Sequence, residues 1–339
     1  MPKQKPSRKI IYFIGAGASY GAGATAAVQG GGKVPIPIQK EFWPTFLRFC
    51  TDREKSKRIE AFLFRYFLNY AKVPGRHSSK QRRELLADID VEEVFTFLSE
   101  RIQAPGTSSQ LRTYTTQIWD DLVSEIGNVF GRYKANKSTR HSYGLLLQNH
   151  VRSRDAVVSF NYDTIFELSM PTQKQWHYVG VSKTANGLKL IKPHGSINWT
   201  LAKHEIRIQE NPEQSLIVAP THLKFVGSEN DDNKHLGTLN HSEEIKFIWE
   251  QMEREMQSAK AFVFIGYSFP VADLYFSSVL RSVLAIRKND PAVVLVNPDA
   301  VDIQRRLQQR FSIKKVFNYF DMDTFFDIKR DRLLNRIQR

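Results

Sequence analysis

Cysteine is almost absent from this chain of 339 residues, since Cys50 is the only one. A single cysteine excludes a disulfide within the chain and a structural zinc site built from four cysteines. The histidines also lack the spacing of metal ligands, so we expect no metal. Apolar runs are short, and none approaches the ~20 residues that span a bilayer. We therefore expect a soluble, cytoplasmic protein with no membrane contact.

Positive charge is in excess, because the chain has 49 Lys and Arg residues and only 35 Asp and Glu residues. Its formal net charge is +14. The basic residues are spread along the whole chain instead of forming one block. Such a distribution suits an anionic nucleotide or an acidic partner as well as it suits a nucleic acid. Composition alone leaves these three classes of partner open.

A short apolar run at residues 10–14 ends abruptly in glycines, beginning with Gly15 and Gly17. This pattern predicts a buried parallel strand that leads into a loop whose backbone approaches a phosphate. The dinucleotide fingerprint G-x-G-x-x-G is not matched, because Tyr20 stands at the third glycine position. The alternative is a tight strand-to-helix turn that binds no ligand.

The chain between residues 40 and 150 shows apolar side chains at three- and four-residue spacing, which predicts helices. Asp90 followed by Glu92 and Glu93 is typical of a capped helix start. The many aromatic residues of 42–70 are expected in the core, with an interaction surface as the alternative. We expect residues 40–150 to form an inserted helical module, preceded by a flexible or ligand-covering segment at 30–37.

From residue 155 onward short apolar runs alternate with amphipathic helices, which predicts a parallel sheet with crossover helices. We therefore expect an α/β fold in which residues 1–39 and 151–339 form a Rossmann-like domain. We expect strands at 156–160, 188–191, 215–219, 261–265 and 292–296. We expect helices at 243–259, 273–286 and 299–311.

Polar or glycine-rich residues follow the predicted strands directly, where parallel sheets bind ligands. They stand in the segments Ser159-Phe160-Asn161-Tyr162-Asp163, Lys192-Pro193-His194-Gly195, Gly266-Tyr267-Ser268 and Asn297-Pro298-Asp299. Together with the glycine loop, these segments predict a nucleotide site in one crevice.

These segments, taken with Gly15-Ala16-Gly17-Ala18-Ser19, resemble the motifs of the SIR2-like family, the sirtuin superfamily in its broad sense, and in family order. The closest resemblance is to its bacterial antiphage-defence branch. It implies a Rossmann-like sheet that binds NAD beside a helical small domain. It also implies cleavage of NAD to nicotinamide and ADP-ribose, which depletes the cofactor in an infected cell and so supports abortive infection.

The resemblance implies a role for each matched residue. His194 is the candidate base or, alternatively, a structural histidine that caps a strand end. Asn161 orients the ribose and the attacking water, and Asp163 holds the nicotinamide carboxamide or, alternatively, caps a helix at 164–168. The remaining matched residues bind the cofactor: Gly15, Ala16, Gly17 and Ser19 at the pyrophosphate, Gly266 and Ser268 in the facing loop, and Asn297 at the adenine ribose.

The chain departs from protein-deacetylating sirtuins, because Cys50 alone cannot build their four-cysteine zinc module. A toxic NADase must also be restrained, so we expect a homo-oligomer or a defence partner, of which ATPases and Argonaute-type proteins are usual in this family. Nucleic acid would be reached through such a partner. The alternatives are a module that binds NAD or ADP-ribose without cleaving it, and a nucleic-acid-associated or nuclease subunit.

Overall fold

The computed structural model describes residues 9–28, 30–70, 78–182, 186–202, 205–210, 215–218, 243–270 and 273–338. Its centre is a seven-stranded sheet with the order β13-β12-β11-β1-β4-β6-β5, in which every neighbouring pair is parallel. The strands are β1 (Ile10–Ile14), β4 (Ala156–Ser159), β5 (Trp176–Tyr178), β6 (Leu188–Ile191), β11 (Ala261–Ile265), β12 (Ala292–Val296) and β13 (Val316–Tyr319). The predicted α/β, Rossmann-like fold is confirmed.

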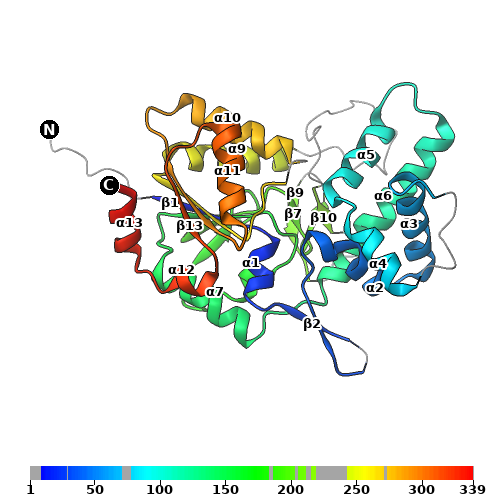
Figure 1. The fold of residues 1–339 in the computed structure, drawn as a ribbon, viewed down its shortest axis with the longest axis horizontal. Coiled ribbons are helices and arrows are strands. Elements are labelled where there is room, and N and C mark those ends of the chain that lie inside the picture. Colours follow the sequence, from blue (N-terminus) through cyan, green and yellow to red (C-terminus); the bar gives the residue numbers. More distant parts are fainter. Residues whose placement is uncertain are drawn as a thin grey trace.

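Burial explains the composition of these strands. All residues of β1, β4, β11 and β12 are buried, as expected for a parallel sheet that is covered on both faces. In Figure 1, α9, α10 and α11 lie above the sheet, and α7 and α12 lie below it. The covering helices are α1 (Ala16–Gly21), α8 (Ile165–Leu168), α9 (Glu243–Ser258), α10 (Leu274–Ile286), α11 (Ala300–Phe311), α12 (Met322–Phe326) and α13 (Arg330–Gln338).

The segment at 40–150 is helical, as predicted, and all of it except its last helix lies beside the sheet layer (Figure 1). It comprises the 3₁₀ turn η1 (Gln39–Glu41), α2 (Phe42–Phe49), α3 (Arg53–Tyr66), α4 (Ser79–Ala87), α5 (Val91–Gln103), α6 (Ser109–Phe130) and α7 (Lys137–Asn149). Asp90 accepts a bond from Glu92 N at 2.8 Å, which confirms the capped start of α5. The last helix, α7, packs against α8 and α12 of the sheet layer. The domain boundary at residue 150 stays a prediction.

Aromatic side chains of the helical segment are core residues, as expected. Phe46 and Phe62 are fully buried, and Phe42 and Phe49 nearly so. Trp43 is also buried, and its indole N–H donates to the carbonyl of Ile89 at 3.1 Å. These rings therefore stabilise the helical segment from inside.

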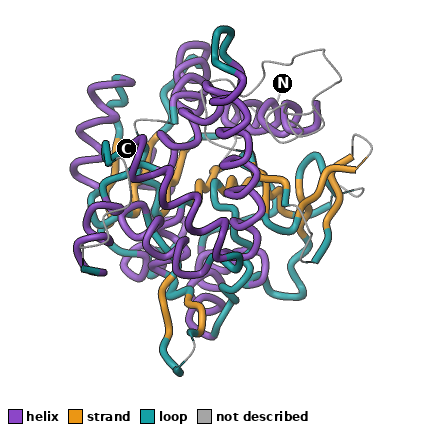
Figure 2. The backbone as a smooth tube through the Cα atoms, turned by 90° about the vertical axis from the view of Figure 1, so that its right-hand side faces the viewer, coloured by secondary structure: helices purple, strands orange, loops and turns teal. Residues whose placement is uncertain are grey.

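One prediction about local structure is wrong. The run at 215–219 is not a strand of the parallel sheet, because β10 (Leu216–Ile217) pairs antiparallel with β7 (Gly195–Ser196); Ala219 lies outside the described residues. Within the segment at 30–37, β3 (Lys33–Pro35) pairs antiparallel with β2 (Thr25–Ala27). This hairpin projects at the bottom of both Figure 1 and Figure 2. That the segment at 30–37 is flexible or covers a ligand stays a prediction. A further antiparallel pair joins β8 (Trp199–Ala202) to β9 (Glu205–Ile208).

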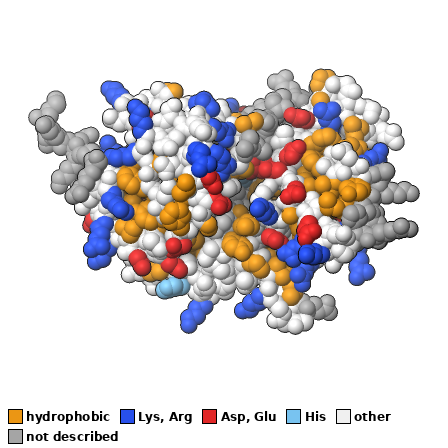
Figure 3. All heavy atoms as spheres, viewed as in Figure 1, with side chains coloured by type: hydrophobic (Ala, Val, Ile, Leu, Met, Phe, Trp, Pro, Cys, Tyr) orange, Lys and Arg blue, Asp and Glu red, His pale blue; other side chains and the backbone are white. Residues whose placement is uncertain are grey.

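Basic side chains on the face drawn in Figure 3 are spread over both the sheet layer and the helical segment. They alternate there with acidic and apolar side chains. This agrees with the dispersed charge of the sequence. Among the described residues, no helix has the length and apolar character to cross a membrane.

Candidate functional site

The candidate site lies where β1 ends, between the ends of its two neighbours β4 and β11. Gly15 N donates to the carbonyl of Ile265 at 3.0 Å, and Phe160 N donates to the carbonyl of Ile14 at 2.9 Å. The loops that follow all three strands therefore start side by side. The order of the strands along the chain reverses at β1, and open parallel sheets bind ligands at such a point.

Three glycines let two of these loops cross in close contact. A Cβ atom on Gly17 would stand 2.8 Å from the carbonyl oxygen of Gly266, and one on Gly15 would stand 2.6 Å from the same atom. Gly266 has a φ of +61°, and its own Cβ would lie 2.0 Å from Ala18 N. The glycines are therefore required by the contact between protein backbones.

The same contact uses N–H groups that the sequence assigned to a pyrophosphate. Gly15 N is bonded to Ile265, and Gly17 N donates to the carbonyl of Gly266 at 3.0 Å. Ala16, between them, is exposed. In this conformation Ala16, the first residue of α1, is exposed and Gly17 is half-buried, and the pyrophosphate role of these residues stays a prediction.

Ser19, Asn161 and Asp163 form one buried hydrogen-bonded cluster. The Asn161 amide donates to the carbonyl of Gly15 at 3.1 Å and to Ser19 Oγ at 3.2 Å. Ser19 Oγ in turn lies 3.3 Å from Asp163 Oδ2. The structure thus brings Ser19 of α1 together with Asn161 and Asp163, which stand more than 140 residues later, in the loop after β4.

Asp163 also makes the bond expected of a helix cap. Its Oδ1 accepts from Ile165 N at 2.9 Å, at the start of α8. Burial raises the pKa of Asp163 to about 6, an effect that outweighs the opposing influence of the Lys192 ammonium. Its carboxyl group therefore changes protonation close to neutral pH, and its contact with nicotinamide stays a prediction.

A buried ion pair behind Asp163 was not predicted. Lys192 Nζ lies 2.8 Å from Glu167 Oε1 and donates to the carbonyl of Asp163 at 2.6 Å. Tyr178 OH donates to the same Glu167 oxygen at 3.1 Å. Lys192 thereby connects the loop after β4 to the loop after β6 through these bonds. The sequence offered a signal, since a lysine directly after an apolar run and before His194 is unusual in a core.

Tyr143 is a second residue that sequence reasoning missed. It belongs to α7, and its hydroxyl lies 3.2 Å from Ser19 Oγ. Burial raises the pKa of Tyr143 above its ordinary value, so the phenol stays protonated. The helix before β4 thus contributes directly to the cluster, and its amphipathic pattern carried no sign of this contact.

His194 follows β6 and lies among aromatic rings. Its ring centroid is 5.2 Å from that of Phe160 and 5.8 Å from that of Trp249, and the residue is 5% exposed. Because Phe160 immediately precedes Asn161, the His194 ring and the cluster occupy neighbouring strand ends. Gly195 has a φ of +77°, and a Cβ there would lie 2.1 Å from the carbonyl oxygen of Leu216. The glycine is thus needed for the pairing of β7 with β10.

Ser268 and Asn297 do not take part in the cluster. Ser268 is exposed, and its carbonyl accepts from Arg306 Nη2 at 2.9 Å. Asn297 Oδ1 accepts from Asp299 N at 2.9 Å, which is a local turn contact. Both residues lie at strand ends on the β11 and β12 side, and their predicted contacts with NAD stay predictions.

Two surface pockets do not coincide with this chemistry. One, of about 690 Å³, reaches α1 through Tyr20 and is otherwise lined by β3 and the helical segment. The other, of about 580 Å³, lies on α7. Neither is lined by Asn161, Asp163 or His194. We therefore place the candidate site by its polar network and the strand ends. In the described part of the chain, no group of three or more His, Cys, Asp or Glu side chains could hold a metal ion.

Comparison with known proteins supports a relation to the sirtuin-like superfamily. Residues 155–316 match the family model of the SIR2-like domain. The match contains Asn161, Asp163, His194, Gly266 and Asn297, and it begins after the glycine loop. No curated protein matches the chain. The relation supports an NAD-related enzyme function.

Proposed function

We propose that this protein is an NAD glycohydrolase that cleaves the nicotinamide–ribose bond and releases nicotinamide and ADP-ribose. The observation that carries the proposal is the buried Ser19–Asn161–Asp163 cluster with His194 at the adjacent strand end. A cluster of buried polar groups at the switch point of a parallel sheet is where such a fold binds its ligand. The SIR2-like match makes NAD the favoured ligand.

The reaction consumes one water molecule. As the bond between nicotinamide and the ribose carbon breaks, its electron pair leaves with nicotinamide and positive charge develops on the ribose. Water adds to that carbon and gives up a proton, for which a neutral His194 imidazole is the acceptor. Asn161 would orient the ribose and this water through its amide, which can both donate and accept.

A specific observation favours the second candidate, a module that binds NAD or ADP-ribose without cleaving it. The His194 ring is almost fully enclosed by aromatic neighbours, and the Asn161 amide donates two bonds within the protein. Groups held in this way suit rigid recognition. Catalysis would then require a rearrangement of these side chains when the ligand binds.

Incubation of the purified chain with NAD separates the two candidates. We expect release of nicotinamide and ADP-ribose in equal amounts, with and without candidate activators compared in parallel. NAD binding measured by calorimetry, with no nicotinamide formed under any of these conditions, would favour the binding module. Absence of both binding and release would overturn the proposal.

The biological role that we propose is depletion of NAD as a cytoplasmic effector of antiphage defence. Restraint of the activity would come from homo-oligomerisation or from a defence partner, for example an ATPase or an Argonaute-type protein that itself contacts nucleic acid. A zinc-dependent deacetylase activity is disfavoured, because Cys50 alone cannot supply a four-cysteine zinc site. We expect infection to lower the cellular concentration of NAD. Substitutions that abolish nicotinamide release in the purified protein should also abolish this loss.

A further inference from the structure

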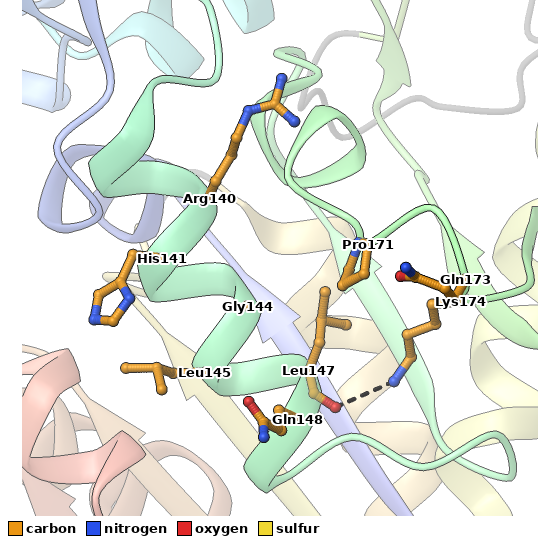
Figure 4. Close-up of a pocket in the computed structure, with 9 residues that line it drawn as sticks. All are labelled: Arg140, His141, Gly144, Leu145, Leu147, Gln148, Pro171, Gln173 and Lys174. Atoms are coloured by element: carbon orange, nitrogen blue, oxygen red, sulfur yellow. Dashed lines mark hydrogen bonds between the residues drawn. The ribbon is translucent and has the colours of Figure 1, made fainter.

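The pocket on α7 is separate from the candidate site and has no role in the proposed reaction. It measures about 580 Å³, within the usual range for small-molecule sites. In Figure 4, Gly144 lies between His141 and Leu145 on one side and Pro171, Gln173 and Lys174 on the other. Its lining is Arg140, His141, Gly144, Leu145, Leu147, Gln148, Pro171, Gln173 and Lys174.

Gly144 creates the floor of this pocket. It stands in the interior of the 13-residue helix α7, where glycine is less favourable than alanine. A Cβ atom on Gly144 would meet no described atom within 4 Å. No packing contact in the described structure thus requires a glycine here, in contrast to Gly15, Gly17 and Gly266. What the missing side chain provides is open space above the helix.

The titratable groups that line the pocket are all basic or neutral. Arg140, His141 and Lys174 contribute to the lining, and none of the nine lining residues is acidic. Lys174 Nζ donates to the carbonyls of Leu147 and Val151 at 3.2 Å each, which uses two of its three N–H bonds. Arg140 is exposed and carries a planar guanidinium that suits a phosphate. The pocket therefore favours an anion.

The other lining groups favour an organic anion over an inorganic anion such as phosphate. Leu145, Leu147 and Pro171 offer apolar surface, and the His141 ring offers a face for stacking. Gln148 and Gln173 carry amides that can both donate and accept hydrogen bonds, as the edge of a nucleobase requires.

We propose that the α7 pocket binds a nucleoside monophosphate, with its phosphate at Arg140 and its base over Gly144. The site is distinct from the predicted NAD site, because Tyr143 reaches Ser19 from a different face of α7. It is independent of whether the chain cleaves NAD. The proposal concerns binding, so its test is a direct binding measurement on the full chain.

The test is calorimetric titration of the purified protein with AMP, with adenosine and inorganic phosphate as separate probes. We expect Gly144→Leu to weaken AMP binding ~10-fold or more, because its side chain fills the pocket without a backbone clash. Arg140→Gln should weaken it to a similar degree, the scale for one charge-assisted hydrogen bond. Adenosine alone and phosphate alone should each bind more weakly than AMP.

Two control variants keep this test decisive. Gly144→Ala should raise the melting temperature and retain more AMP affinity than Gly144→Leu, since it adds one methyl group in open space. Arg254→Gln removes the same charge from an exposed position on α9 and should leave AMP binding unchanged. Equal AMP binding by the parent and by folded Gly144→Leu would overturn the proposal. So would no AMP binding by the parent, equal losses in Arg254→Gln and Arg140→Gln, or phosphate binding as tight as AMP.

Discussion

At the scale of single residues, His194 combines a position at a strand end with an aromatic enclosure. If it is the base, His194→Ala should slow nicotinamide release by ~10²-fold or more, the usual contribution of general base catalysis. NAD binding should change little, because the proton acceptor acts in the chemical step. Steady-state kinetics and calorimetry measure the two effects separately.

His194→Ala also removes a buried ring and can destabilise the fold, so this prediction needs a control variant. His194→Gln keeps much of the volume and should show the same kinetic loss with a melting temperature nearer that of the parent. Parental rates of nicotinamide release in either folded variant would show that His194 is structural.

Asp163 gives a prediction about stability and pH. Its pKa is about 6 in the folded protein against an ordinary 3.8, so the folded state holds this proton more tightly. The stability that the protonated carboxyl provides is fully present below pH 4 and is lost as pH rises through about 6. The maximum slope for one group is ~1.4 kcal/mol per pH unit.

Asp163→Asn cannot titrate and is the matched variant. The free energy of unfolding of the parent, minus that of the variant, should fall from pH 4 to about pH 6 and stay constant at higher pH. Urea unfolding at a series of pH values measures it. A difference that is flat over this range would mean that Asp163 titrates as an ordinary exposed carboxyl group.

At the scale of elements, a buried ion pair connects α8 to the loop after β6. The side chains of Lys192 and Glu167 are 0% and 5% exposed. Lys192→Met should destabilise by ~3–5 kcal/mol, because it leaves the Glu167 carboxylate buried without its partner. The double variant with Glu167→Leu should recover part of this loss. Urea unfolding of the four proteins gives the coupling energy.

Lys189 provides the control, because it lies in β6, three residues before Lys192. It is 44% exposed and lies 2.7 Å from Glu255, so Lys189→Met should cost less than ~1 kcal/mol. Additive losses in the Lys192 and Glu167 variants would show that the buried pair is not coupled.

The elements also show what sequence patterns could and could not predict. The strands β1, β4, β11 and β12 were predicted because each is a short run of mostly apolar residues between turn residues, and β6 because three of its four residues are apolar. The edge strands β5 and β13 were missed, because an edge strand needs less apolar surface and its runs contain polar residues such as His177 and Asn318. The run at 215–219 looked the same as a sheet strand, since hydrophobicity does not reveal the pairing partner.

The same limit applies to the site. Motif order located Asn161, Asp163 and His194 at strand ends, and the parallel sheet then placed these ends together. The contacts of Tyr143 and Lys192 depend on helix packing, which no local pattern encodes. Gly15 and Gly17 were read as ligand-facing, and only the structure shows that Gly266 requires them.

At the scale of the whole molecule, Arg330 at the start of α13 joins the C-terminal helix to the centre of the sheet. Its Nη1 lies 2.6 Å from Asp155 Oδ2 and its Nη2 3.0 Å from Asp155 Oδ1, in a bidentate pair. Asp155 Oδ1 also accepts from Ile10 N at 2.9 Å, at the start of β1. One guanidinium therefore connects β1, the turn before β4 and α13.

This arrangement predicts that Arg330 matters for the stability of the entire sheet layer. Arg330→Met should destabilise by ~3–5 kcal/mol, because Asp155 is fully buried and would lose its partner. Arg330→Lys keeps the charge but not the planar fork, so its cost should be smaller but clear. Arg332→Met, at an exposed position of the same helix, should change stability by no more than ~0.5 kcal/mol. Urea unfolding followed by circular dichroism measures all three, and a loss in Arg330→Met no larger than in Arg332→Met would show that α13 is only loosely attached to the sheet.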